Sequence, residues 1–541
     1  MDIVFRGALV VDGTGAPGHR ADVGVRDGRI AAIGDRVTGG RTVEADGRVL
    51  APGFIDMHSH SDLQVLANPE HLAKVTQGVT TEVLGQDGLS YAPVDDDVLA
   101  VLRAQLAGWN DDPAGFDWDW RSVGEYLDRL DRGIAVNAAY LVPQGTLRML
   151  CVGHEDRPPT DRELDRMREV LATSLREGAM GLSSGLTYTP GMYADTAELT
   201  ALCRVVAEHG GFHSPHHRSY GAGALEAYAE MIAVSRDSGC PLHLAHATMN
   251  FEVNRGRAGE LLALLDDAIA DGADLTLDTY PYLPGATYLS ALLPSWAGEG
   301  GPDATLARLS DPATRERIRV EVEEVGSDGC HGVPVDWEAI EVNGVRRPAN
   351  GHLVGLSVAE AARRAGRPPA ELYFDVLVSE RLGTSCLMHV GHEDNVRAIM
   401  RHPAHTGGSD GLLVGDRPHP RAWGTFPRYL ARYVRELGVL GLEECVHHLT
   451  GRAARRLRLA DRGLVREGFA ADLVLFDPDA VADTATFDRP RQAAAGITHV
   501  VVNGVPVVDD GRRTGALPGT SLRNPRSRPR STGRGTRREG R

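Results

Sequence analysis

The chain contains one segment, Ala51-Pro-Gly-Phe-Ile-Asp-Met-His-Ser-His-Ser-Asp62, that joins a Pro-Gly break, a short apolar run and a His-x-His pair. The break and the apolar run predict the end of one structural unit and the start of a buried strand. Alternate side chains of an extended chain point the same way, so His58 and His60 would project together from the end of that strand. Two imidazoles on one face can hold a divalent cation, and we expect Asp56 and Asp62 to fix the orientation of the rings.

Four further segments place a possible metal ligand where an apolar run ends. They are Gly85-Gln-Asp87-Gly88, Phe212-His-Ser-Pro-His216, Leu242-His-Leu-Ala-His246 and Thr406-Gly-Gly-Ser-Asp410-Gly411. Taken singly, a glycine-flanked aspartate is more often a turn residue, and a histidine in an apolar strand is more often a hydrogen-bonded core residue. Because all five strand ends carry metal-ligand types, we interpret them together as a site for one or two Zn²⁺ ions. Zinc activates water near neutral pH, which predicts hydrolysis of an amide or related C–N bond with Asp410 as general base.

A chain of 541 residues is long enough for one large α/β domain and a smaller one. Its composition, with 42% hydrophobic and 24% charged residues, is that of a globular protein. The net charge of −16 argues against nucleic acid as a partner. No apolar run is long enough to span a bilayer, and the first residues lack the pattern of a secretion signal, so no membrane partner is expected. Six cysteines without framework spacing are typical of reduced thiols in a cytoplasmic protein.

Strand-like and helix-like segments alternate through the middle of the chain, and about eight repeats predict an α/β fold, a (β/α)8 TIM-like barrel. The expected strands include 80–84, 135–140, 181–183, 211–215, 242–246, 275–279, 386–389 and 406–409, and the expected helices include 161–177, 196–209, 224–238 and 258–270. Short strands separated by glycine turns lie near both chain ends. They predict a small β-sandwich domain built from both ends of the chain.

We therefore expect three parts. Residues 1–54 and 456–515 would form the β-sandwich domain, and residues 55–455 the catalytic barrel, with an insertion at about 285–350 where the alternation breaks down. The insertion could cover the barrel mouth as a lid. Residues 516–541 are rich in Arg, Pro, Gly and Ser and nearly empty of apolar residues, which predicts a disordered basic tail.

Several segments are similar to motifs of the metal-dependent amidohydrolase superfamily and, within it, of the N-acyl-D-amino-acid deacylases (D-aminoacylases). They are residues 52–62, Gln77-Gly-Val-Thr-Thr81, Gly181-Leu-Ser-Ser-Gly-Leu-Thr-Tyr188, Gly391-His-Glu-Asp-Asn-Val396, Gly408-Ser-Asp-Gly411 and His419-Pro-Arg-Ala-Trp-Gly-Thr-Phe-Pro-Arg428. The similarity spans nearly all of residues 1–510. The resemblance implies a barrel with a β-sandwich, bound zinc, and a small N-acyl amino acid as substrate, hydrolysed to a D-amino acid and a carboxylate.

Carried over by position, the resemblance also implies roles for single residues. His216 and His246 resemble the pair that holds the tightly bound zinc. His58, His60 and Asp410 resemble the second, weaker site, with Asp410 as general base. Arg421 and Tyr280 resemble the residues that bind the substrate carboxylate. The planar guanidinium of an arginine can donate two parallel hydrogen bonds to a carboxylate.

Two positions depart from the family pattern. Asp87 stands where these deacylases usually have cysteine, and a carboxylate there can still ligate or bridge zinc. Thr248 stands where a lysine usually follows the last metal histidine by two residues, so one positive charge for the substrate is missing. The substrate would then carry less negative charge, or it would meet another arginine; the candidates are Arg218, Arg255 and Arg257.

Two other readings compete with this one. A cyclic-amide hydrolase of the dihydroorotase or hydantoinase kind typically bridges two metals with a carboxylated lysine, and the chain has a single lysine, Lys74, which lies before the Asp87 strand. A non-catalytic binding protein on a barrel scaffold is the other, since a fold alone does not give an activity. The full set of ligands and a base favours the deacylase.

Overall fold

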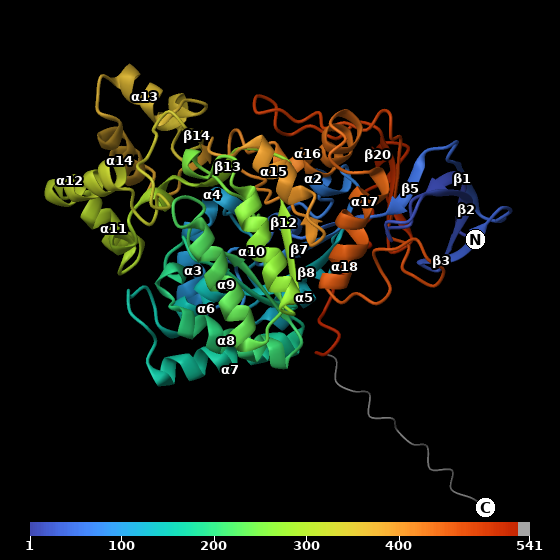
Figure 1. The fold of residues 1–541 in the computed structure, drawn as a ribbon, viewed down its shortest axis with the longest axis horizontal. Helices are drawn as coiled ribbons and strands as arrows, with labels where there is room; N and C mark the ends of the chain where they lie inside the picture. Colours follow the sequence, from blue (N-terminus) through green and yellow to red (C-terminus); the bar gives the residue numbers. More distant parts are fainter. Residues whose placement is uncertain (528–541) are drawn as a thin grey trace, which may run out of the picture.

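Eight parallel strands form the barrel at the centre of the computed structural model, which describes residues 1–527 (Figure 1). They are β6 (Phe54–Asp56), β7 (Val79–Leu84), β8 (Asn137–Pro143), β9 (Gly181–Gly185), β10 (Phe212–His216), β11 (Leu242–Leu244), β12 (Leu275–Thr279) and β16 (His405–Gly407). Their spatial order follows the chain, and each strand runs parallel to its neighbour. The predicted (β/α)8 fold is therefore confirmed.

The first and last barrel strands are joined by backbone and side-chain contacts. The amide of Met57 donates to the carbonyl of Gly407 (3.0 Å), which closes the barrel after β6 and β16. Lys74 is fully buried beside this seam, and its Nζ donates to Asp56 Oδ2 (2.6 Å) and to Ser409 Oγ (2.9 Å). The only lysine of the chain thus holds two distant segments together at the barrel seam.

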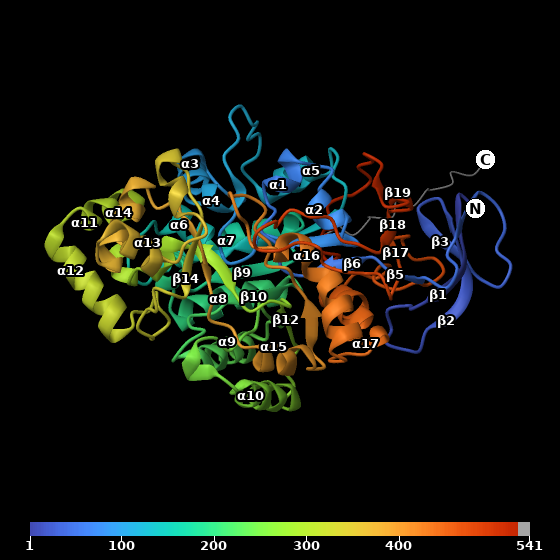
Figure 2. The ribbon, with the colours of Figure 1, turned by 90° about the horizontal axis from the view of Figure 1, so that it is seen from above.

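Helices cover the outside of the barrel (Figure 2). The longer ones are α3 (Asp96–Gln105), α5 (Val123–Leu130), α6 (Gln144–Cys151), α7 (Asp161–Glu177), α8 (Thr196–Glu208), α9 (Ala224–Ser238), α10 (Ala258–Ala270), α15 (Glu393–Met400) and α16 (Arg421–Arg428). Short helices are α1 (Gln64–Ala67), α2 (Leu72–Val75), α4 (Ala107–Asn110), α17 (Leu442–His447) and α18 (Ala453–Arg456). The helices predicted at 161–177, 224–238 and 258–270 coincide with α7, α9 and α10, and a capping box of Thr160 and Glu163 starts α7. Within residues 1–527, no helix combines the length and apolar character needed to cross a bilayer.

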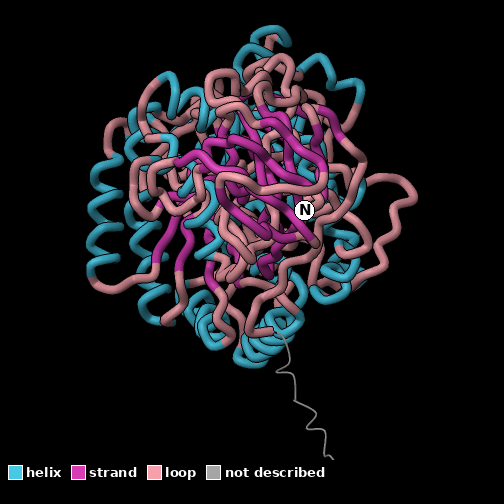
Figure 3. The backbone as a smooth tube through the Cα atoms, turned by 90° about the vertical axis from the view of Figure 1, so that its right-hand side faces the viewer, coloured by secondary structure: helices cyan, strands magenta, loops and turns pink. Residues whose placement is uncertain are grey.

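Both ends of the described chain contribute to one nine-stranded sheet, which faces the viewer in Figure 3. Its strands are β1 (Ile3–Val10), β2 (His19–Arg26), β3 (Arg29–Gly34), β4 (Arg41–Glu44), β5 (Val49–Pro52), β17 (Leu473–Phe476), β18 (Ile497–Val502), β19 (Val505–Asp509) and β20 (Arg512–Arg513). Strand β5 pairs antiparallel with β17, with Leu50 opposite Leu475. Phe5, Val23 and Leu473 pack in one apolar core, so both ends of the chain build this small β domain.

Residues 285–388 form an insertion lobe with its own apolar core, at the end of the molecule opposite the nine-stranded sheet (Figure 1). It contains β13 (Gly285–Tyr288), α11 (Pro302–Leu309), α12 (Pro312–Val320), β14 (Ile340–Gly344), α13 (Val358–Ala365), α14 (Pro369–Ser379) and β15 (Ser385–Met388). The barrel strand predicted at 386–389 was wrong, because this segment is the central strand of the lobe's own antiparallel sheet. A four-residue apolar run has no periodicity that could distinguish the two. The lobe also extends beyond the 285–350 expected.

The segment 516–527 follows the barrel surface in an ordered path. Gly519 N donates to Ile134 O (2.8 Å), and Leu522 N donates to Ala138 O (2.7 Å). Leu522 enters an apolar cluster with Met180 and Phe212. The disorder predicted from residue 516 therefore does not hold for 516–527, because backbone hydrogen bonds and one leucine anchor a polar sequence. The rest of the predicted tail, 528–541, lies outside the described residues.

We expect Leu522→Ala to lower the free energy of unfolding by about 2 kcal/mol, near the lower limit for removing a buried leucine side chain. Leu517→Ala is the matched control, because Leu517 belongs to the same segment but is 38% exposed, against 9% for Leu522. The control should stay within about 0.5 kcal/mol of the parent protein. Urea denaturation of both variants measures the difference, and equal effects would contradict the packing role of Leu522.

Candidate metal centre

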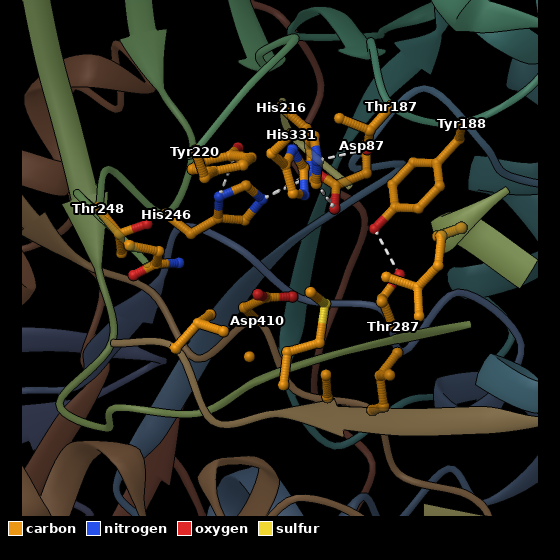
Figure 4. Close-up of a pocket in the computed structure, with 18 of the residues that line it drawn as sticks. Asp87, Thr187, Tyr188, His216, Tyr220, His246, Thr248, Thr287, His331 and Asp410 are labelled. Atoms are coloured by element: carbon orange, nitrogen blue, oxygen red, sulfur yellow. Dashed lines mark hydrogen bonds and ion pairs between the residues drawn. The ribbon is translucent and has the colours of Figure 1, made fainter. Parts of the chain in front are cut away.

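Four histidine rings and two carboxylates meet at the carboxyl-terminal ends of the barrel strands. Figure 4 shows four of these residues, Asp87, His216, His246 and Asp410. The residues are His58 and His60 after β6, Asp87 after β7, His216 at the end of β10, His246 after β11 and Asp410 after β16. All six are buried. The structure thus brings together every residue that the sequence predicts as a metal ligand, although they come from five separate strands.

Asp87 lies between the two histidine pairs. Its Oδ1 is 3.4 Å from His58 Nε2 and 3.5 Å from His246 Nε2. Its Oδ2 is 3.4 Å from His60 Nε2 and 3.3 Å from His216 Nδ1. Each oxygen therefore lies near one ring of each pair, so Asp87 would be a ligand in either group.

The ligand atoms form two groups that share Asp87. The first contains His58, His60, Asp87 and Asp410, the second contains Asp87, His216 and His246, and within each group the ligand atoms lie within 4.8 Å of one another. Ring nitrogens face each other at 3.3 Å in the first group and at 3.0 Å in the second. Imidazole nitrogens and carboxylate oxygens are ligands that Zn²⁺ accepts, so the donor set fits one or two zinc ions.

Both carboxylates are held in their anionic form. Burial alone would raise the pKa of Asp87, but the neighbouring charges of His58, His246 and His216 outweigh it and lower that pKa. Burial also opposes ionisation of Asp410, yet the charge of Arg421 and the hydrogen bond from His60 lower its pKa below the usual value. A pair of anions among imidazoles attracts a cation.

Three of the six ligands have a backbone conformation that side chains disfavour. The φ angles are 54° for Asp87, 30° for His246 and 48° for Asp410, all in the left-handed region. Such residues cost of order 1–3 kcal/mol each and persist where the surrounding structure fixes them, frequently at functional sites. The turns therefore aim these side chains at the centre of the barrel mouth.

Groups that the sequence analysis did not assign hold the outer nitrogens of the rings. Thr187 Oγ1 is 2.7 Å from His216 Nε2, and Tyr220 OH is 2.9 Å from His246 Nδ1. Asp278 accepts a hydrogen bond from the amide of His246 (3.0 Å) and lies 3.8 Å from His58 Nδ1. Asp278 stands near the end of β12, so the rule applied to the other strand ends could have found it. Thr187 and Tyr220 lie in loops whose path no sequence pattern shows.

Asp56 and Asp62 do not orient the histidine rings as predicted. Asp56 is bound to Lys74, and Asp62 accepts hydrogen bonds from the amide of Gly85 (2.8 Å) and from Ser90 Oγ (2.6 Å). Nearness in sequence was a poor guide here, because β6 ends at Asp56 and the same-face rule of an extended strand does not hold for the residues that follow it. Asp62 instead fixes the turn that carries Asp87.

Arg421 lies directly beside Asp410. Its Nη2 is 2.9 Å from Asp410 Oδ2, and its guanidinium stacks over the ring of Tyr280 at 4.4 Å. The side chain is fully buried, and Nε and Nη1 have no hydrogen-bond partner among residues 1–527. Two donor nitrogens of Arg421 are therefore unpaired next to the candidate base.

An open cavity of about 710 Å³ lies over the metal centre, with walls from the barrel and from the insertion lobe. Barrel loops contribute Trp109, Tyr188, Tyr220 and Thr248, and the lobe contributes Thr287, Leu292, His331 and Met388. No arginine or lysine of the described chain lines this cavity. Three arginines considered from the sequence are paired elsewhere: Arg218 with Glu230, Arg255 with Glu252, and Arg257 with Glu260. None of the three lines this cavity, which leaves the other alternative, a substrate with less negative charge.

Comparisons with known proteins agree with this geometry. D-aminoacylase from Alcaligenes xylosoxydans xylosoxydans is 35% identical over 524 residues, covering 96% of this chain and 97% of that protein. N-acyl-D-glutamate deacylase from the same organism is 37% identical over 510 residues, covering 94% and 93%. A crystal structure of N-acyl-D-glutamate deacylase from Bordetella bronchiseptica, with zinc and a phosphonate inhibitor, superposes with a TM-score of 0.81 at 34% identity and covers 97% of this chain and 99% of that one. The profile described as Amidohydrolase family matches residues 41–508, and the chain belongs to that family.

Proposed function

We propose that the chain is a zinc-dependent deacylase that hydrolyses N-acyl-D-amino acids to a D-amino acid and a carboxylate. The observation that carries the proposal is the pair of ligand groups that share Asp87 at the mouth of an amidohydrolase barrel. Two relatives that match nearly the whole chain are named for this reaction on D-amino acid substrates. His216 and His246 would hold the first zinc, and His58, His60 and Asp410 the second.

Asp410 is the proposed general base. Zinc, when bound, polarises a carbonyl oxygen and lowers the pKa of water. Asp410 Oδ2 is held by Arg421, while Oδ1 lies 3.1 Å from His60 Nε2 and faces the metal centre. A carboxylate fixed at one oxygen can use the other to accept a proton from the attacking water and to deliver it to the leaving nitrogen. Cleavage of the amide C–N bond then releases the amine.

Arg421 and Tyr280 are the proposed receptors of the substrate carboxylate. The free N–H donors of Arg421 are buried, and leaving buried donors unpaired costs free energy. A carboxylate accepts charge-assisted hydrogen bonds from such donors. Tyr280 lines the cavity, and its ring stacks on the guanidinium of Arg421, which does not line the cavity itself. A carboxylate would therefore meet Tyr280 first and reach Arg421 at the edge of this ring.

The cavity favours amino acids with uncharged side chains. Thr248, Asn250 and His331 line the part beyond His246, and none of the cavity walls carries an arginine or lysine in the described chain. Burial lowers the pKa of His331 to about 3, so this ring is neutral at physiological pH. A second carboxylate on the substrate would meet Asp87 and Asp410 without a compensating cation.

The two competing functions lose their main support. Lys74 is engaged with Asp56 and Ser409 at the barrel seam, and Asp87 occupies the shared position between the ligand groups that a carboxylated lysine would take. A non-catalytic barrel has no need of a strained aspartate such as Asp410 beside a metal centre. A cytoplasmic location remains a prediction from the sequence.

With Zn²⁺ present, N-acetyl-D-amino acids should be hydrolysed at least about 10²-fold faster than their L enantiomers, because a polar site that fixes the carboxylate and the amide rejects the inverted substituent. Release of free amine from a chiral panel measures this ratio. Chelation should abolish the activity and added zinc should restore it. Equal turnover of both enantiomers, or none with zinc firmly bound, would refute the proposal.

Asp410→Asn should retain the fold and most of the bound zinc while kcat falls by about 10²- to 10⁴-fold, the usual contribution of a general acid–base group. Asp416→Asn is the matched control, since Asp416 lies in the same loop region but is exposed. Metal analysis and steady-state kinetics of both variants make the comparison. Near-normal kcat in Asp410→Asn would remove this residue from the role of base.

Thr248→Lys should raise the kcat/KM ratio of N-acetyl-D-glutamate to N-acetyl-D-leucine by about 10-fold or more, because one charge-assisted hydrogen bond contributes about 1.5–3 kcal/mol. Thr248→Met adds similar bulk without charge and should leave acidic substrates disfavoured. Kinetics with both substrates test the pair of variants. An equal rise of this kcat/KM ratio in both variants would show that the size of the side chain at position 248, and not its charge, determines which substrate is preferred.

A further inference from the structure

A second cavity lies next to the one over the metal centre. It lies between α3, the loop after β9 and the insertion lobe. Its apolar lining includes Met192, Tyr288, Leu293, Pro294, Leu306 and Leu382, and its polar lining includes His154 and two exposed arginines, Arg346 and Arg381. It contains none of the six candidate zinc ligands, and neither Arg421 nor Tyr280 reaches it. None of the residues proposed for zinc binding, proton transfer or carboxylate binding therefore uses this second cavity.

The two cavities adjoin at three residues. Thr187, Tyr188 and Ala291 line both of them. Thr187 also contacts the metal centre directly, through the 2.7 Å contact between its Oγ1 and His216 Nε2. Thr187 therefore contacts a candidate zinc ligand and lines the second cavity as well.

Packed aromatic rings keep this boundary in place. The rings of Trp109 and Tyr288 stack at 4.3 Å with an interplanar angle of 10°, and Tyr188 meets both edge-on at 5.4 and 5.5 Å. The hydroxyl of Tyr188 is 2.9 Å from Thr287 Oγ1 (Figure 4). Trp109 lines the first cavity and Tyr288 the second, so the same stack forms a wall of each.

We infer that the second cavity receives the acyl chain of the substrate, and that the enzyme acts on medium-length aliphatic acyl groups in preference to acetyl. The inference rests on the proposed deacylase function. The scissile carbonyl carbon has two substituents, and the amine half carries the carboxylate that Arg421 and Tyr280 would bind. Neither receptor borders the second cavity, and neither does the Thr248 wall proposed to meet the amino-acid side chain, so the acyl half is the group left to enter this cavity at Thr187 and Tyr188.

Burial of the acyl chain against the apolar part of the lining determines how much KM should fall with chain length. Burying one methylene group improves affinity by about fourfold at best, and part of that gain is lost in ordering the chain. An octanoyl chain adds six methylene groups to acetyl. Because the chain lies away from the reacting bond, its burial should appear mainly as a lower KM with kcat nearly unchanged.

The test uses the zinc-loaded full-length enzyme and N-acyl derivatives of one neutral D-amino acid with acetyl, butanoyl, hexanoyl and octanoyl groups. Leu306→Trp fills the second cavity, and Ala307→Trp is its matched control on the exposed side of α11. Ala104→Trp narrows the cavity from the barrel side and serves if Leu306→Trp does not fold.

We expect the octanoyl KM of the parent enzyme to be about 10-fold or more below the acetyl KM. Leu306→Trp should remove this advantage and leave acetyl kcat/KM within about twofold, while Ala307→Trp should match the parent. A KM that does not fall with chain length, or an octanoyl advantage that survives both cavity-filling variants, would overturn the inference. Absent hydrolysis of the acetyl substrate would instead refute the deacylase proposal itself.

Discussion

The metal centre depends on one carboxylate whose backbone is held in a left-handed turn. Asp87 contacts rings from the ends of β6, β10 and β11, so any displacement of its turn would alter both ligand groups together. The turn has little freedom to move, because a Cβ at Gly88 would lie 2.5 Å from the backbone nitrogen of Gly185 in β9. Close packing of two backbones thus fixes the position of the anion around which the histidines gather.

A second network of buried charge holds the loop that carries Asp410. Asp56 Oδ1 accepts from the amide of Ser409 (2.8 Å), and its Oδ2 is paired with Lys74. Glu82 lies 4.0 Å from Lys74 and 2.9 Å from His71 Nε2. Removing the lysine would leave two buried carboxylates short of a cation, which is far more costly than breaking a surface pair. The position of the single lysine is therefore explained by the structure of the seam.

The sequence predicted the barrel and all six candidate ligands because both follow from local rules: apolar strands, helical spacing and polar residues where strands end. The predictions from sequence were wrong where contacts between distant parts of the chain determine the structure. The run at 386–389 has the pattern of any buried strand, and only its antiparallel partners place it in the lobe. Residues 516–527 lack the composition of an ordered segment, yet backbone pairing near Ile134 and Ala138 orders them. Asp56 was assigned to a ring by nearness, although a buried lysine is its partner.

Chemistry and selectivity are carried by different parts of this chain. The barrel ends supply every candidate ligand among the described residues, whereas Thr287, Leu292, His331 and Met388 bring the insertion lobe onto the cavity. The barrel is closed by its own strands and by Lys74, so its ligand distances do not depend on the lobe. The entropic cost of an inserted segment grows only slowly with its length, and a lobe with its own core offsets that cost. Substitutions in the lobe can therefore change which acyl group or side chain fits without disturbing the carboxylate that organises the metal centre.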